Sequence, residues 1–204
     1  MAYSSFSALD LKNKFGVDQE FVDGIFTQIK PHKASDLLLA NLKQNLNFAL
    51  NQSTEKARSE FIIAPVFAEL FVQGHGKVSI FSGVEFNVDR KLGLIGWCDF
   101  LVSRSSFQRE LEAPVVIAVE AKQDDFKKGI SQCIAEMIAA RIFNEKNGKP
   151  IAKIYGCVTT GDVWRFLVLE DNLAKIETVS FDVREDIERI LGILYSMALG
   201  ETEG

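Results

Sequence analysis

The sequence predicts an α/β fold in which a mixed sheet carries helices on its faces. Three observations predict it: leucines at helical spacing over residues 35–51, strand-like alternation over 78–88, and a short apolar run at 115–119 followed by a long helical pattern. Helices, three strands, another helix and further strands follow one another in that order, which favours a mixed sheet covered by helices. The 204 residues suffice for one domain with a sizeable core, so we expect a single domain over 1–204.

Residues 1–52 are expected to form a helical extension. Short amphipathic pieces lie at 7–15 and 18–29, and Ser35 can cap a helix that runs to residue 51. A second helix is expected from Ser53 or Thr54 to about residue 73. Pro65 should kink it, because proline has no N–H for the helical bond back to Phe61.

The middle of the chain reads as three strands. Apolar residues alternate over 78–88, Asp89-Arg90-Lys91 turns the chain, and a second strand is expected at 92–103. Pro114 then opens Val115–Val119, an uninterrupted apolar run that is typical of a buried central strand.

A long helix and a second group of strands complete the prediction. Asp124 or Asp125 can cap a helix that ends near Asn147, before Gly148. Strands are expected at 153–160 and 163–169. A further strand at 176–181 and a last helix at 184–199 would make up the C-terminal part, 170–204.

Composition is that of a soluble globular protein, with 47% hydrophobic and 25% charged residues. No apolar run approaches the ~20 residues of a membrane helix, and the start has no signal-peptide pattern. Cys98, Cys133 and Cys157 are an odd number, far apart, without a C-x-x-C pair, which argues against a disulfide framework or a zinc site. The expected location is the cytoplasm.

The net charge of −5 is unusual for a nucleic-acid-binding protein, but it is unevenly distributed. Residues 166–204 carry nine acidic and three basic residues, a local charge of −6. Residues 1–165 therefore sum to +1. The acidic excess belongs to the C-terminal part, and the middle of the chain remains open to an acidic partner such as nucleic acid.

The chemistry of the chain is expected at the end of the apolar strand. Glu120 and Lys122 lie two residues apart, so their side chains project from the same face. Asp99 lies 21 residues upstream, on the expected neighbouring strand. If the strands pair, Asp99 and Glu120 can hold a hard cation such as Mg²⁺, with the Ala121 carbonyl as a further ligand. The alternative is a surface salt bridge at a strand end.

These residues resemble the PD-(D/E)XK nuclease superfamily, most closely the nuclease domains at the N-terminus of type I restriction enzyme motor subunits. The resemblance covers about 53–169 and rests on Asp99, on Glu120-Ala121-Lys122, on Gln132 in the next helix, and on Glu60 in Arg58-Ser59-Glu60. Tyr155–Phe166 resembles the paired strands that follow the active-site helix. Cys98, not proline, precedes Asp99. The fold implied is restriction endonuclease-like, with α-β-β-β-α-β order.

The resemblance also implies roles. Asp99, Glu120 and the Ala121 carbonyl would bind Mg²⁺ or Mn²⁺, with Glu60 as a secondary ligand. Lys122 would orient the attacking water and neutralise charge on the phosphate, and Gln132 would hold Lys122 or the water. Lys127 and Lys128 at the start of that helix would contact backbone phosphates.

Three functions remain open. The first is a metal-dependent endonuclease that hydrolyses phosphodiester bonds in nucleic acid, with DNA as the expected substrate. The second is a non-catalytic binding or assembly module of the same fold, with a protein partner or a homo-oligomer. The third is an unrelated α/β enzyme. Glu60 as a solvated helix residue, and Lys127 with Lys128 as a solvated face, are the simpler alternatives at those positions.

Overall fold

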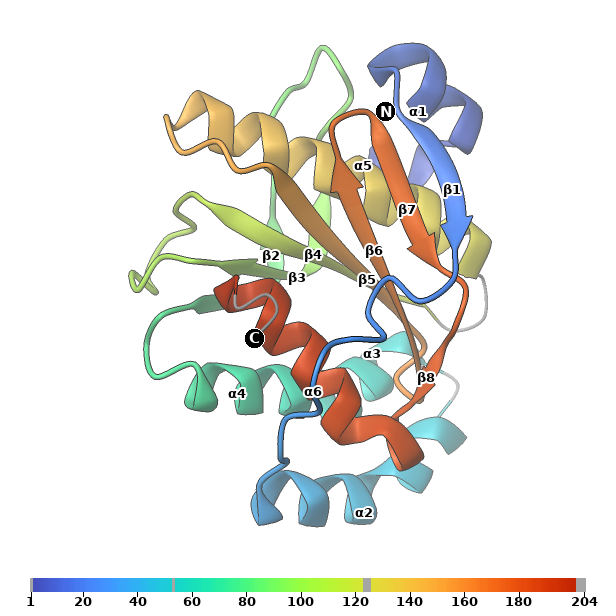
Figure 1. The fold of residues 1–204 in the computed structure, drawn as a ribbon, viewed down its shortest axis with the longest axis vertical. Coiled ribbons are helices and arrows are strands. Elements are labelled where there is room, and N and C mark those ends of the chain that lie inside the picture. The colour runs from blue at the N-terminus through green and yellow to red at the C-terminus, as the bar shows by residue number, and fades with distance from the viewer. Residues whose placement is uncertain (1, 53, 123–125, 201–204) are drawn as a thin grey trace.

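An open, mixed sheet of eight strands with helices on both faces forms the centre of the protein (Figure 1). The computed structural model describes residues 2–52, 54–122 and 126–200. The strands are β1 (Asp18–Val22), β2 (Ser79–Glu85), β3 (Trp97–Ser103), β4 (Val115–Ala121), β5 (Lys153–Thr159), β6 (Val163–Glu170), β7 (Leu173–Glu177) and β8 (Phe181–Asp182). The helices of four or more residues are α1 (Ala8–Phe15), α2 (Asp36–Asn51), α3 (Glu55–Arg58), the π-helical η2 (Ser59–Ile63), α4 (Ala64–Gln73), α5 (Phe126–Lys146) and α6 (Val183–Leu199), and a short 3₁₀ turn, η1, covers Tyr3–Ser5.

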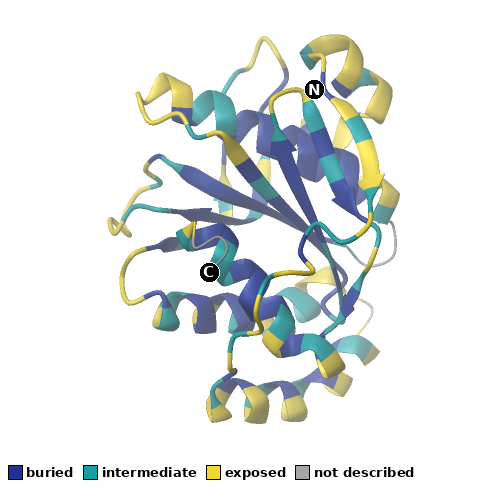
Figure 2. Ribbon diagram, viewed as in Figure 1, coloured by how far each residue is buried: buried dark blue, intermediate teal, exposed yellow. Residues whose placement is uncertain are grey.

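The strand order places β4 in the interior of the sheet. The order is β1-β7-β6-β5-β4-β3-β2, and β8 pairs with β6. β4 runs antiparallel to β3 and parallel to β5, and all seven of its residues are buried (Figure 2). The expectation of a buried central strand is confirmed, because a strand covered on both faces has no position for an exposed polar side chain.

Each face of the sheet has its own hydrophobic core. Figure 1 shows α5 and α1 on one side and α2, α4 and α6 on the other. The first core includes Leu11, Ile134 and Ile138, and the second includes Leu42 and Phe67. Across the described ranges, no helix has the length and apolar character that a bilayer crossing requires.

Most of the predicted elements form, and side-chain hydrogen bonds to the backbone mark where some of them begin. The Ser35 hydroxyl accepts from the Leu38 N–H and begins α2 as expected. β3 begins at Trp97, later than predicted, because Asp89 Oδ1 accepts from the N–H groups of Lys91 and Leu92 and prolongs the turn. The predicted caps Asp124 and Asp125, and Ser53 as a helix start, lie outside the described residues.

The disturbance expected at Pro65 takes the form of a π-helical segment. α3, η2 and α4 follow one another without a break, and the Ala64 N–H donates to the Ser59 carbonyl, five residues back. Pro65 has no N–H to donate, and the wider π-helical turn lets the helix continue past it without that hydrogen bond.

The prediction for residues 18–29 was wrong in its first half. Residues 18–22 form β1, which runs parallel to β7 at the edge of the sheet, so the N-terminal part is not purely helical. The expected strand at 176–181 is divided between β7 and β8. β1 reads Asp-Gln-Glu-Phe-Val and is largely exposed, so it lacks the apolar alternation that identifies a strand.

Candidate active site

The site lies where β3 and β4 separate. Their pairing includes Phe100 with Val119, and Asp99 and Glu120 are the next residues on the two strands. The Ala121 N–H donates to Asp99 Oδ2 over 2.7 Å. This bond holds the Asp99 carboxylate beside β4, so the two acids that the sequence separates by 21 residues are brought together.

Glu120 is buried and both of its oxygens are bound. Its side chain is 2% exposed, Oε1 pairs with the Lys122 ammonium, and Oε2 accepts from Gln132 Nε2 over 2.7 Å. An exposed salt bridge at the strand end is therefore not what forms. Gln132 binds Glu120, where the sequence reasoning expected it to hold Lys122 or a water.

A third carboxylate, Glu136, was missed by the sequence reasoning. It lies on α5 and is fully buried, and its Oε1 accepts from the same Gln132 amide over 3.2 Å. Its Oε2 has no hydrogen-bond partner among the described residues. One feature of the sequence could have identified Glu136. It lies four residues after Gln132, so both side chains share one face of a helix whose other buried residues are mostly apolar.

Burial raises the pKa of every carboxyl group in this cluster, and repulsion between neighbouring carboxylates adds to the shift at Glu120 and Glu136. Burial, followed by the charge of Asp99, raises the pKa of Glu120 to about 7, although Lys122 opposes the shift. Burial also raises the pKa of Asp99, against the Ala121 hydrogen bond, and raises that of Glu136 well above its ordinary value. The surroundings therefore disfavour full ionisation of the cluster, and an added cation would favour the ionised carboxylates.

Lys122 is the cation already present. Burial disfavours its charge, but the attraction of Glu120 and their hydrogen bond outweigh burial and raise the pKa of the amine. Its backbone N–H donates to the Thr159 carbonyl over 2.8 Å, which continues the β4–β5 ladder past the end of β4. Lys122 therefore remains charged, with its backbone fixed by the sheet.

Of the upstream acids, Glu55 acts electrostatically on the site, whereas the role of Glu60 as a secondary ligand stays a prediction. The charge of Glu55 acts on both Asp99 and Lys122 and raises the pKa of each. Glu60 instead pairs with Lys56 over 3.7 Å, and its side chain is 55% exposed. Nothing in the sequence distinguishes Glu55 from an ordinary acidic residue in the first turn after the Thr54 cap.

Gly129 on α5 allows Lys122 to lie against the helix. A Cβ at Gly129 would lie 2.8 Å from Val158 Cγ1 and 3.0 Å from Lys122 Cγ, which is too close for a side chain.

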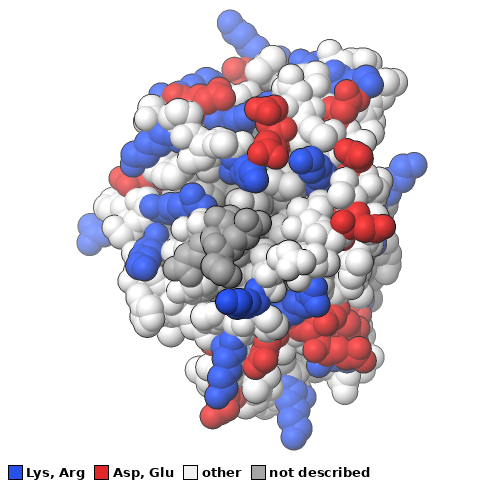
Figure 3. All heavy atoms as spheres, in the orientation of Figure 1, with Lys and Arg blue, Asp and Glu red and all other residues white. Residues whose placement is uncertain are grey.

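The neighbouring Lys127 and Lys128 are exposed at the start of α5, so they are accessible to a large partner. On the face drawn in Figure 3, basic and acidic side chains are interspersed, without a continuous basic stripe.

The donor set suits a cation that keeps part of its water shell. In the described part of the chain, no three His, Cys, Asp or Glu residues gather as a metal-binding group. Asp99 and Glu120 offer two carboxylates, and the Ala121 carbonyl could add a third oxygen. Mg²⁺ is commonly held by one or two carboxylates together with water and phosphate oxygens, so these residues fit it.

No family model matches the sequence, and no curated protein does. The function must therefore be argued from the arrangement of Asp99, Glu120, Lys122, Gln132 and Glu136.

Proposed function

We propose that the protein is a metal-dependent nuclease that hydrolyses phosphodiester bonds in nucleic acid, with DNA as the expected substrate. The observation that carries the proposal is the meeting of two carboxylates and a paired lysine where β3 and β4 separate. Perturbed acids beside a fixed cation are typical of catalytic sites. The resemblance of Asp99, Glu120-Ala121-Lys122 and Gln132 to the PD-(D/E)XK superfamily supports the same conclusion and a restriction endonuclease-like order of elements.

Each residue of the proposed site has a distinct role in the reaction. Asp99, Glu120 and the Ala121 carbonyl would hold Mg²⁺, which when bound polarises the phosphate and lowers the pKa of a bound water. Lys122 supplies a fixed positive charge beside the phosphate and stabilises the charge that develops in the transition state. Gln132 fixes the orientation of Glu120 through the 2.7 Å hydrogen bond. Lys127 and Lys128 would contact backbone phosphates without reading sequence.

Substitution of Lys122 tests the proposal. Lys122→Ala and Lys122→Gln should reduce Mg²⁺-dependent cleavage of plasmid and single-stranded DNA by about 100-fold or more, the usual cost of one transition-state charge contact. Glutamine keeps most of the packing against Gly129 but loses the charge. The matched control is Lys56→Gln, which removes a lysine that is also paired with a glutamate but is 82% exposed.

Melting curves establish that each variant is folded before rates are compared. Cleavage by the Lys122 variants at the wild-type rate would refute the role of this residue. Loss of activity in the Lys56→Gln control as well would mean that the effect is one of general charge.

The second candidate is a non-catalytic binding or assembly module. The net charge of −5 and the mixed charges of Figure 3 favour it, since strong nucleic-acid binders usually carry a basic stripe. A wild-type protein that leaves every DNA and RNA substrate intact in Mg²⁺ and in Mn²⁺ would make this the better interpretation.

A further inference from the structure

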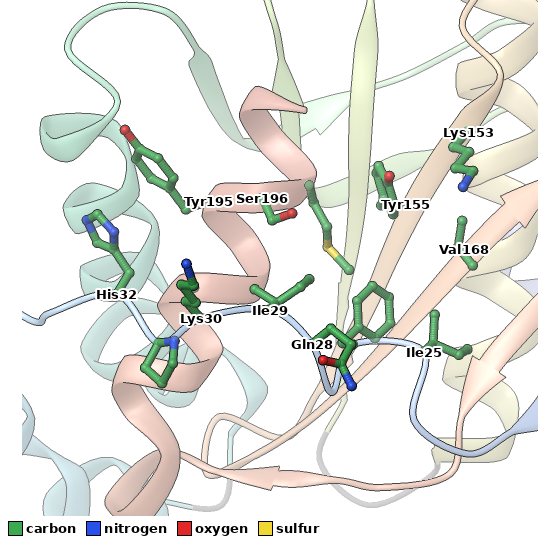
Figure 4. A pocket seen from close by; sticks show the side chains of 14 residues that line it. Ile25, Gln28, Ile29, Lys30, His32, Lys153, Tyr155, Val168, Tyr195 and Ser196 are labelled. Carbon is green, nitrogen blue, oxygen red and sulfur yellow. The ribbon is translucent and has the colours of Figure 1, made fainter. Parts of the chain in front are cut away.

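A second site lies on the sheet face that carries α6, far from the carboxylate cluster. A pocket of about 550 Å³ opens between the segment 25–32, α6 and the strands β5 and β6 (Figure 4). A volume between about 300 and 1,000 Å³ is usual for small-molecule sites. The pocket is therefore large enough to enclose a small organic molecule.

The strand register separates this pocket from the proposed active site. β5 runs parallel to β4, and Tyr155, which lines the pocket, lies opposite Ile117. Glu120 lies opposite Val158, three residues further along. Lys153, at the start of β5, also lines the pocket. The pocket is thus displaced toward the opposite end of the strands, and α6 and α5 cover opposite faces of the sheet (Figure 1).

The wall formed by residues 25–32 is held at both ends. At the first end, the buried Glu177 carboxylate accepts from the N–H groups of Gly24 over 2.9 Å and Phe26 over 3.3 Å. At the other end, the His32 N–H donates to the Glu188 carbonyl over 2.8 Å. A Cβ at Gly192 would lie 2.2 Å from the Lys30 carbonyl oxygen, so α6 touches this wall through a residue without a side chain. The pocket is therefore built into the fold before any ligand arrives.

The chemistry of the lining is apolar inside and cationic at the rim. Phe26, Val168 and Met197 are buried and supply apolar surface. Lys30 and Lys153 are the charged side chains among the described lining residues, and none of these residues is acidic. Figure 4 shows the side chains of Ser196 and Tyr155 between those of Lys30 and Lys153.

The amine of Lys153 is already near one acid, but in an exposed contact. It lies 3.5 Å from Glu170, whose other oxygen lies 3.5 Å from Lys175. The side chain of Lys153 is 48% exposed, and such a pair is worth little in water. Lys153 can therefore exchange this contact for a ligand anion at small cost, while Lys175 continues to neutralise Glu170.

We propose that this pocket binds a small organic anion with one negatively charged group on an apolar or aromatic body. The apolar interior takes the body, because transfer of apolar surface from water is favourable. The lysines and the hydroxyl groups of Ser196 and Tyr155 take the carboxylate or phosphate. The positive charge of the lysines disfavours cations, and no acid among the described lining residues offsets it. This inference is independent of the proposed nuclease function.

The probe is 1-anilinonaphthalene-8-sulfonate, whose fluorescence rises in apolar sites, and its uncharged analogue N-phenyl-1-naphthylamine. Lys153→Gln and Lys30→Gln should each weaken binding of the sulfonate about fivefold, the effect of one exposed ion pair, and leave binding of the neutral analogue unchanged. Lys175→Gln is the matched control, because it contacts the same Glu170 over the same distance without lining the pocket. Ser196→Leu, on α6, should weaken both probes by filling the pocket.

Competition against the sulfonate identifies the kind of anion. Displacement by octanoate indicates a carboxylate on an aliphatic body. Displacement by adenosine 5′-monophosphate indicates a phosphate on a planar aromatic body. Melting curves confirm folding of each variant, since unfolded protein also binds the sulfonate. The proposal is overturned if the sulfonate does not bind the folded wild type. It is also overturned if Ser196→Leu leaves both probes bound as before, or if Lys175→Gln weakens the sulfonate as much as Lys153→Gln does.

Discussion

At the residue scale, the surroundings of Glu120 have opposing effects on its ionisation. It is buried, it lies next to Asp99, and it is held by Lys122 and Gln132. Burial disfavours the ionised carboxylate that a metal ligand requires, whereas the lysine and the amide favour it. The outcome is a pKa of about 7 against an ordinary 4.5, so the protonation of this group changes near neutral pH.

Glu120 should therefore make the folded protein less stable as pH rises. The fold binds this proton more tightly than the unfolded chain does, so the stabilisation is complete below pH 4.5 and is lost as pH passes about 7. The free energy of unfolding should fall by on the order of 3 kcal/mol over that range from this group. Denaturant unfolding of wild type and Glu120→Gln between pH 4.5 and 8 measures it.

Glu120→Gln, which cannot ionise, should show a shallower pH dependence. A smaller slope should remain, because the pKa of Asp99 and that of Glu136 are raised as well. Identical slopes in the two proteins would show that Glu120 titrates normally.

Gly129 gives a second prediction at this scale. Alanine favours the helix over glycine by about 1 kcal/mol, so a Gly→Ala substitution at an exposed helix position normally stabilises a protein. Here the added Cβ meets Val158 and Lys122, and we expect a loss of about 1–3 kcal/mol from overpacking, together with slower cleavage. Thermal unfolding and plasmid cleavage are the measurements, and Glu145→Ala on the exposed face of α5 is the control. A more stable Gly129→Ala protein would contradict the close packing.

At the element scale, buried acids join segments that are distant in sequence. Glu69 on α4 accepts from the backbone N–H and the hydroxyl of Ser35, each over 2.8 Å, and from Gln73 Nε2. Since Ser35 also caps α2, one carboxylate fixes the start of α2 against α4. Glu177 does the same for the segment that follows β1.

Glu69→Ala should destabilise the protein by about 2–3 kcal/mol, because the Ser35 donors lose a charged acceptor. Urea unfolding measures the loss, and Glu188→Ala, which removes an exposed acid from α6, should change the free energy of unfolding by less than about 0.5 kcal/mol. An equally small effect at Glu69 would mean that water replaces the carboxylate without cost.

At the scale of the whole molecule, the negative excess of the chain and the residues of the proposed site lie in different parts of the sequence. The negative excess belongs to residues 166–204, whereas the site lies between residues 99 and 136. Long-range attraction of nucleic acid should therefore be weak and sensitive to salt, and bound metal should improve it.

Metal binding should raise the stability of the whole fold. A ligand that binds only the folded form raises the unfolding midpoint, and 1 kcal/mol corresponds to about 2–4 °C for a chain of this size. Millimolar Mg²⁺ or Mn²⁺ should raise the Tm of the wild type but not of Asp99→Asn/Glu120→Gln. Equal shifts in both proteins would remove the metal site from the proposal.

The sequence alone predicted most of the elements and four members of the cluster, of which Gln132 was named through the resemblance. Hydrophobic periodicity is a local property, so α2, β4, α5 and α6 could be predicted from it. Asp99, Glu120 and Lys122 could be predicted because charged groups at the end of a buried strand are costly unless they pair or bind a ligand.

Only the tertiary structure decided the remaining features, because each depends on contacts between distant segments. The edge strand β1 has no apolar pattern of its own and is identified by its pairing with β7. The charge of Glu55 acts on Asp99, whereas Glu60 pairs with Lys56, and nothing in the local sequence distinguishes these two helical acids. Glu136 and the pocket under residues 25–32 arise from burial, which is set by how helices pack on the sheet and not by local sequence.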